Sequence, residues 1–291
     1  MYSAQLVLNG KPLDRYQVAE GLIGLDVGPS TVAVVANAGA WKETFCAELD
    51  DQARELQRLQ RRLDRQHRAG SPTCFDEQGS HITGACHWRV RSNRAHLTQA
   101  QIRELQRRVA EHRRSLHGNL ANRVLGQGRI IHTERLSYRA LQRCFGRSVG
   151  RRAPGMFIAT LSRKAASAGG TVALVDTRTT RLSQECVCGA VAKKPLSQRS
   201  HRCACGVEAD RDVFAAFLVR HVDPRVHPHL LDVDGARAAL SMLQDSGAGR
   251  RRAVLNRRVP QALPVGYGVT RRSRSAESPQ GAADARKGEA A

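Results

Sequence analysis

Two pairs of closely spaced cysteines are the residues of this chain best suited to chemistry. Cys186-Val-Cys188-Gly189 and Cys203-Ala-Cys205-Gly206 are joined by a short polar segment. Four thiolates suit a structural tetrahedral Zn²⁺ site, and the glycine behind each pair permits a sharp turn. Only one residue separates the cysteines of each pair, so we expect turns tighter than in most zinc ribbons. His201 is an alternative ligand, and unligated thiols are the remaining alternative.

Three acidic residues could hold a second kind of metal. Asp26 lies inside the apolar run GLIGLDVG, Glu134 ends the strand-like run RIIHTE, and Asp212 opens a helix in EADRDVFAAFL. Hard divalent cations such as Mg²⁺ or Mn²⁺ take oxygen ligands, and two of them can assist the attack of water on a phosphodiester. Each acid also has a plainer interpretation: a turn carboxylate, a solvated strand end, or a helix N-cap at Asp210 or Asp212.

The charge balance indicates a polyanionic partner. The chain has 47 Lys and Arg against 26 Asp and Glu, a net charge of +21. Counterion release rewards such a surface on nucleic acid, whereas a GC-rich genome explains only the preference for Arg over Lys. Aromatic residues make up 4% of the chain, which argues against broad base-stacking platforms. The candidate nucleic-acid-binding residues are Arg103, Arg107, Arg147, Arg151, Arg152, Lys193 and Lys194.

The hydrophobic pattern predicts an α/β fold with a mixed sheet and flanking helices. Residues 21–36 read as a buried strand hairpin that turns at Gly28-Pro29. Leucines on one face predict a hairpin of two long helices over 49–125. Further strands are expected at 129–134 and 171–176, and further helices at about 154–168, 211–221 and 235–244. The pattern shows neither a membrane span nor a secretory signal, so we expect a place in the bacterial cytoplasm, at the nucleoid.

Three segments, GLDVGPSTVAVV, TERLSYRAL and SQECVCG…HRCACGVEADRDVFAAF, resemble the transposon-encoded TnpB proteins. These proteins are relatives of the type V CRISPR effectors and are commonly called transposases. The resemblance covers roughly residues 20–222 and implies an RNase H-like (RuvC) nuclease with an inserted zinc ribbon. It also implies cleavage of DNA under a guide RNA, with Asp26, Glu134 and Asp212 as the Mg²⁺-binding catalytic acids.

The resemblance also implies a division of the chain. The expected parts are a barrel remnant at 1–20, a nuclease core at 21–182, a zinc ribbon at 183–206, a last nuclease segment at 207–222 and a weakly structured basic tail at 223–291, which composition predicts to be disordered from Asp245 onward. Phe214 stands where the family usually has Asn, and only 25 residues precede Asp26, which leaves little room for the domains that grip the guide. Two alternatives therefore remain: a truncated, inactive nucleic-acid-binding relic, and a DNA strand-transfer transposase.

Overall fold

The computed structural model describes residues 18–82, 92–195 and 197–245. The chain divides into Met1–Asn256 and Arg257–Ala291, and every described residue lies in the first of these units. Residues 1–17 of the expected barrel remnant and the basic tail beyond residue 245 lie outside the described residues.

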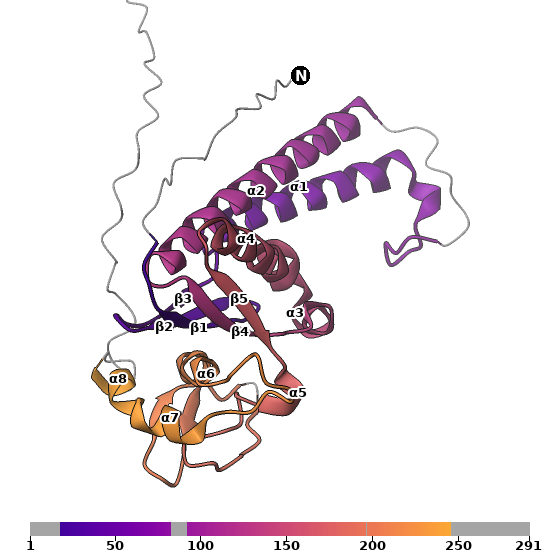
Figure 1. Ribbon diagram of the computed structural model, residues 1–291. Coiled ribbons are helices and arrows are strands. Elements are labelled where there is room, and N and C mark those ends of the chain that lie inside the picture. Colours follow the sequence, from indigo (N-terminus) through magenta and orange to yellow (C-terminus); the bar gives the residue numbers. More distant parts are fainter. Residues whose placement is uncertain (1–17, 83–91, 196, 246–291) are drawn as a thin grey trace, which may run out of the picture. The chain divides into compact units, whose positions relative to one another are not determined.

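A five-stranded sheet forms the centre of the fold (Figure 1). Its order is β3-β2-β1-β4-β5, in which β1 and β2 pair antiparallel, β2 and β3 pair antiparallel, and β1, β4 and β5 run parallel. The strands are β1 (Leu22–Val27), β2 (Thr31–Ala36), β3 (Gly39–Thr44), β4 (Ile130–Glu134) and β5 (Thr171–Val175). The expectation of a mixed sheet with flanking helices is confirmed.

Helices cover both faces of the sheet (Figure 1). On one face, apolar side chains of β1, β2 and β4 pack against α2 (Asn93–Leu125) and α4 (Pro154–Ser167). On the other face, β2 packs against α6 (Arg211–Arg220), whose Val213–Val219 segment is buried throughout. Burial of β-branched and leucine side chains on both faces drives this layering.

The helical hairpin consists of α1 (Leu49–Gly70) and α2, which pack through Leu56, Leu59, Leu63, Ile102 and Leu105. The predicted hairpin is therefore confirmed. The smaller elements are η1 (Pro72–Cys74), α3 (Tyr138–Arg152), α5 (Thr177–Thr180), β6 (Ser200–Arg202), β7 (Glu208–Asp210), α7 (Val233–Ala238) and α8 (Leu240–Asp245). None of the helices in the described ranges is both long and apolar enough to cross a membrane.

The elements that differ from the sequence prediction include β3, α3 and the helix expected at 235–244. The edge strand β3 was not predicted, because a six-residue segment between glycine and a turn carries little hydrophobic periodicity. The same holds for α3, which contains two glycines and is kinked at Phe145 (φ −124°, ψ 30°). The single helix expected at 235–244 is two short helices, α7 and α8, which meet at Ala239.

Candidate metal centres

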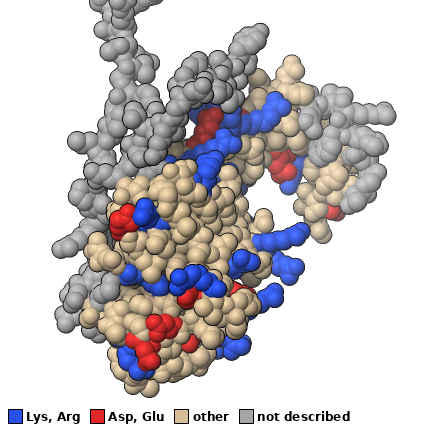
Figure 2. All heavy atoms as spheres, in the orientation of Figure 1, with Lys and Arg blue, Asp and Glu red and all other residues tan. Residues whose placement is uncertain are grey.

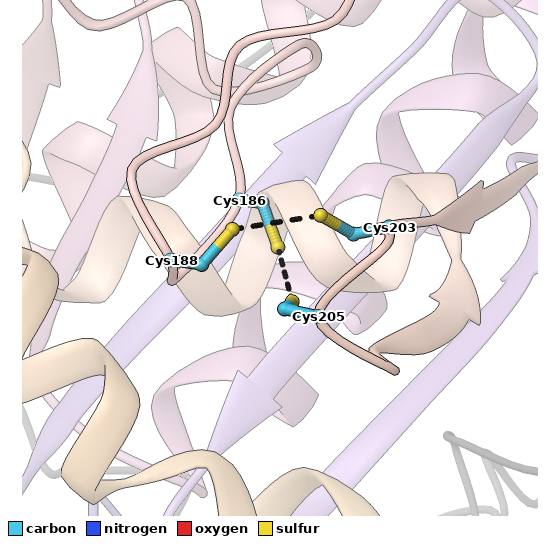
Figure 3. Close-up of side chains that lie close together, drawn as sticks. All are labelled: Cys186, Cys188, Cys203 and Cys205. Atoms are coloured by element: carbon cyan, nitrogen blue, oxygen red, sulfur yellow. Dashed lines mark hydrogen bonds between the residues drawn. The ribbon is translucent and has the colours of Figure 1, made fainter.

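The four cysteines of the two pairs converge on one point (Figure 3). Their sulfur atoms all lie within 4.8 Å of one another, with Cys186 Sγ 3.7 Å from Cys205 Sγ and Cys188 Sγ 3.5 Å from Cys203 Sγ. Four sulfurs at about 2.3 Å from a tetrahedral Zn²⁺ stand about 3.8 Å apart, whereas a disulfide needs about 2.05 Å. The cluster could therefore hold Zn²⁺.

Each pair is shaped by the same backbone turn. Gly189 N donates to Cys186 O at 2.8 Å, and Gly206 N donates to Cys203 O at 3.0 Å. Both glycines have positive φ, +82° and +91°, a conformation that side chains disfavour. The backbone N–H of Cys205 and the neighbouring thiols lower the pKa of Cys203 to about 7, whereas burial raises the pKa of Cys186. The glycines thus make the short one-residue spacing workable.

His201 lies beside this cluster rather than within it. Its Nδ1 is 2.7 Å from Lys194 Nζ, and its ring lies over the ring of Phe214, with centroids 4.1 Å apart. Burial, together with the charge of Lys194, lowers the pKa of His201 to about 4. The neutral ring therefore serves as packing between β6 and α6, and Phe214, 1% exposed, is its counterpart in the core.

Asp26 and Glu134 lie side by side on the face of the sheet that α6 covers. Leu25 pairs with Thr133 in the parallel register, so the next residues along, Asp26 and Glu134, are neighbours on adjacent strands. Leu25 packs into the opposite core, and side chains alternate along a strand, so Asp26 turns toward α6.

Asp212 reaches the same region from the first turn of α6. The preceding Asp210 caps this helix by accepting hydrogen bonds from the backbone N–H groups of Asp212 and Val213 at 2.9 and 3.2 Å. Asp210 is therefore the N-cap, as one interpretation of the sequence suggested. Asp212 is 7% exposed and accepts a hydrogen bond from Thr31 Oγ1 at 3.2 Å.

A lysine that the sequence did not single out joins this region. Lys42 Nζ lies 2.7 Å from Asp212 Oδ2 and 2.9 Å from both carboxylate oxygens of Asp210. Ala33 pairs with Asp26 on one side and with Lys42 on the other, so these residues form one row across β1, β2 and β3.

The acids affect one another's protonation through burial and charge. Burial raises the pKa of Asp26, and the charges of Glu134 and Asp212 raise it further, whereas Lys42 and Arg211 oppose them. Burial raises the pKa of Glu134 to about 7. Tyr138 shares this environment, because burial and the charges of Asp26 and Glu134 raise the pKa of its phenol. Buried carboxylates that repel one another are stabilised by a divalent cation.

The acids are more widely spaced than the thiols. Among the described residues, the cysteines form a group of potential metal ligands whose atoms all lie within 4.8 Å, and the three acids do not. A single ion needs that closeness, but two ions about 4 Å apart, each about 2.1 Å from its oxygens, accept ligands spread over roughly 8 Å. The three carboxylates therefore do not all lie within reach of one common ion.

The candidate nucleic-acid-binding residues divide into exposed and engaged side chains. Arg103, Arg147 and Lys193 are exposed. Arg107 is held between Glu104 and Glu111 on α2. Figure 2 shows Lys and Arg side chains projecting from the hairpin and from the core beneath it.

The other candidates contact the protein itself. Arg152 is 7% exposed; its Nε donates to Phe45 O at 2.6 Å and its Nη2 lies 3.0 Å from Asp50. Arg151 binds the same carboxylate, and Lys194 contacts His201. We therefore assign Arg152 to the interior, where it joins α3 to the start of α1, rather than to a phosphate-binding surface.

A comparison with known protein families gives a match over the part of the chain that contains the four cysteines and Asp212. Residues 155–219 match the family described as Cas12f1-like, TNB domain. No curated protein matches the chain. The matched residues run from α4 through the four cysteines to Asp212 and α6, and the match supports a relationship to the TnpB and Cas12 proteins.

Proposed function

We propose that this protein is a RuvC-type nuclease that hydrolyses DNA phosphodiesters by a two-metal mechanism under the direction of a guide RNA. The observation that carries the proposal is the convergence of Asp26, Glu134 and Asp212 on the α6 face of the sheet, where the charges of the other two acids raise the pKa of Asp26. The strand order, with its antiparallel and parallel halves, supports an RNase H-like core. The Cas12f1-like match supports the nuclease class and nucleic-acid partners.

In this proposal the three acids share one task. The carboxylates of Asp26, Glu134 and Asp212 would together hold the cations. Bound Mg²⁺ or Mn²⁺ would activate a water molecule and stabilise the leaving oxygen. Thr31 and the Asp210 cap would hold the carboxylate and helix of Asp212 in place. The four cysteines would hold Zn²⁺ as a structural site that anchors the N-terminus of α6.

Cleavage assays on the full chain test the proposal. In the presence of Mg²⁺ or Mn²⁺, we expect DNA to be cut when a matching RNA is bound to the protein, and not to be cut when RNA is absent. Asp26→Asn should lower the rate by at least about 100-fold, because it removes a carboxylate that would hold the metal ions. Each tenfold loss corresponds to about 1.4 kcal/mol of transition-state stabilisation. Glu43→Gln is the matched control, since Glu43 lies on β3 but pairs with Arg123 outside the site.

The assay also separates the two alternatives. Nucleic-acid binding without metal-dependent cutting would favour an inactive relic. Joining of DNA ends in place of hydrolysis would favour a strand-transfer enzyme. Cutting that survives Asp26→Asn unchanged would remove the proposed centre from the reaction.

A further inference from the structure

Four arginines form a straight row along the outer face of α1. Arg54, Arg58, Arg61 and Arg65 follow one another at intervals of four, three and four residues, which places them within about 60° of arc on a helix of 3.6 residues per turn. All four are exposed, and Gln57 lies beside them. We call these four residues the arginine row.

The row lies opposite the face by which α1 packs on α2. Leu56, Leu59 and Leu63 hold the inner face against Ile102 and Leu105. At 1.5 Å per residue, the outer row spans about 16 Å of rigid helix. The positions of its guanidinium groups are therefore set by a packed hairpin and not by a loop.

Placing these arginines together has a cost within the protein. Like charges three or four residues apart destabilise a helix by about 0.2–0.5 kcal/mol per pair. Arg54 and Arg58 are partly compensated by Asp51 and Glu55. Within the described ranges, neither Arg61 nor Arg65 forms an ion pair with a carboxylate. The hairpin packing does not need these charges, so a ligand outside the chain best explains them.

We propose that the arginine row binds the sugar–phosphate backbone of a DNA double helix. Guanidinium groups match phosphate geometry, and phosphates held at fixed spacing by a duplex suit a row fixed on a rigid helix. The row and the neighbouring Gln57 lack the aromatic side chains on which single-stranded bases stack. This role rests on the proposed partner class but not on the three acids.

The salt dependence of binding tests the row. The triple variant Arg58→Gln, Arg61→Gln, Arg65→Gln should lower the slope of log affinity against log salt for a short DNA duplex by about 2–3, because each lost phosphate contact removes about 0.9. Anisotropy of a labelled duplex measures the slope. Thermal melting should stay within a few degrees of wild type, because the three side chains are exposed.

The control variant removes the same charge elsewhere. Arg123, Arg225 and Arg237, each paired with its own carboxylate, are replaced by Gln together. The proposal requires a slope change below about 1 for this control, and a smaller loss for the single strand than for the duplex. Equal losses in the two triple variants, or a greater loss on the single strand, overturn it. Asp26→Asn should leave the slope unchanged, so failure of cleavage and failure of the row are distinguishable.

Discussion

Lys42 Nζ lies 2.7 Å from Asp212 Oδ2, so the third acid of the proposed centre already has a cation beside it. The lysine side chain is 17% exposed and the aspartate side chain 9% exposed, which limits screening by solvent. Burial by itself lowers the pKa of Lys42. The hydrogen bonds to Asp212 and Asp210 outweigh this effect, so the pKa of the lysine is raised. A divalent ion that binds Asp212 must therefore share or displace this ammonium group.

Lys42→Met should tighten the binding of Mn²⁺ and weaken the metal-free fold. Removal of the competing charge should raise Mn²⁺ affinity by roughly tenfold, equivalent to about 1.4 kcal/mol. The same change leaves Asp210 and Asp212 without their partner and should lower the melting temperature without metal. Calorimetric Mn²⁺ titration and thermal melting measure the two effects. Arg123→Met, which removes the exposed pair with Glu43, should change neither; weaker Mn²⁺ binding by Lys42→Met would contradict the idea.

The stability of the metal-free protein should fall as pH rises toward neutrality. The pKa of Glu134 is raised to about 7, so the folded state binds this proton more tightly than the unfolded chain does. The contribution of this proton to stability is therefore fully present below the ordinary carboxyl pKa and is lost progressively as the pH rises from there to about 7. Urea unfolding at a series of pH values should show this slope in wild type and a shallower one in Glu134→Gln, because the buried Asp26 still contributes. Parallel curves for the two proteins would refute the assignment.

Gly24→Ala should disrupt the packing of β1 against α6, on the face of the sheet where the three acids lie. A Cβ at Gly24 would lie 1.7 Å from Ala216 O, a backbone atom of α6 that cannot turn aside. The forced separation of β1 and α6 should cost about 3 kcal/mol or more. Gly118→Ala is the control, because its Cβ meets nothing within 4 Å on α2 and should stabilise the helix by about 0.5–1 kcal/mol. Denaturant titration of both variants gives the comparison.

Removal of zinc should loosen the segment that carries Asp212. Cys188→Ser, or treatment with a strong chelator, should release the metal, detected by elemental analysis, and lower the melting temperature. Mn²⁺ affinity should fall with it, since β7 and the Asp210 cap would lose their support. Cys144→Ser replaces an exposed free thiol on α3 and should leave both quantities unchanged. Full Mn²⁺ binding by a zinc-free protein would argue against this coupling.

Much of the fold was accessible from local sequence pattern. The β-branched apolar runs of β1 and β2, the leucine face of α1 and the two cysteine turns each depend on residues close in the chain. These patterns predicted the hairpin, the helices and the convergence of the thiols. The spacing Cys-x-Cys-Gly also predicted the tight turns, which the positive φ of Gly189 and Gly206 confirms.

The roles of Lys42 and Arg152 could not be predicted in the same way. Lys42 meets Asp212 only because β3 pairs with β2 in a register that puts it beside Ala33, and because α6 crosses that row. Arg152 reads as one member of a basic run, but the path of α3 carries it to Asp50 and Phe45 O. Such contacts depend on how distant segments pack.

The second cysteine turn and Asp212 share one short stretch of backbone. From Cys205 the chain passes through β7 directly into the N-terminal cap of α6, where Lys42 binds the carboxylate of Asp210. The Zn²⁺ held by the cysteine sulfurs would thereby fix the position at which carboxylate oxygens bind Mg²⁺ or Mn²⁺. We expect this protein to lose its activity in a cell starved of zinc while its central sheet stays folded. Binding of Mg²⁺ or Mn²⁺ would then depend on the supply of Zn²⁺.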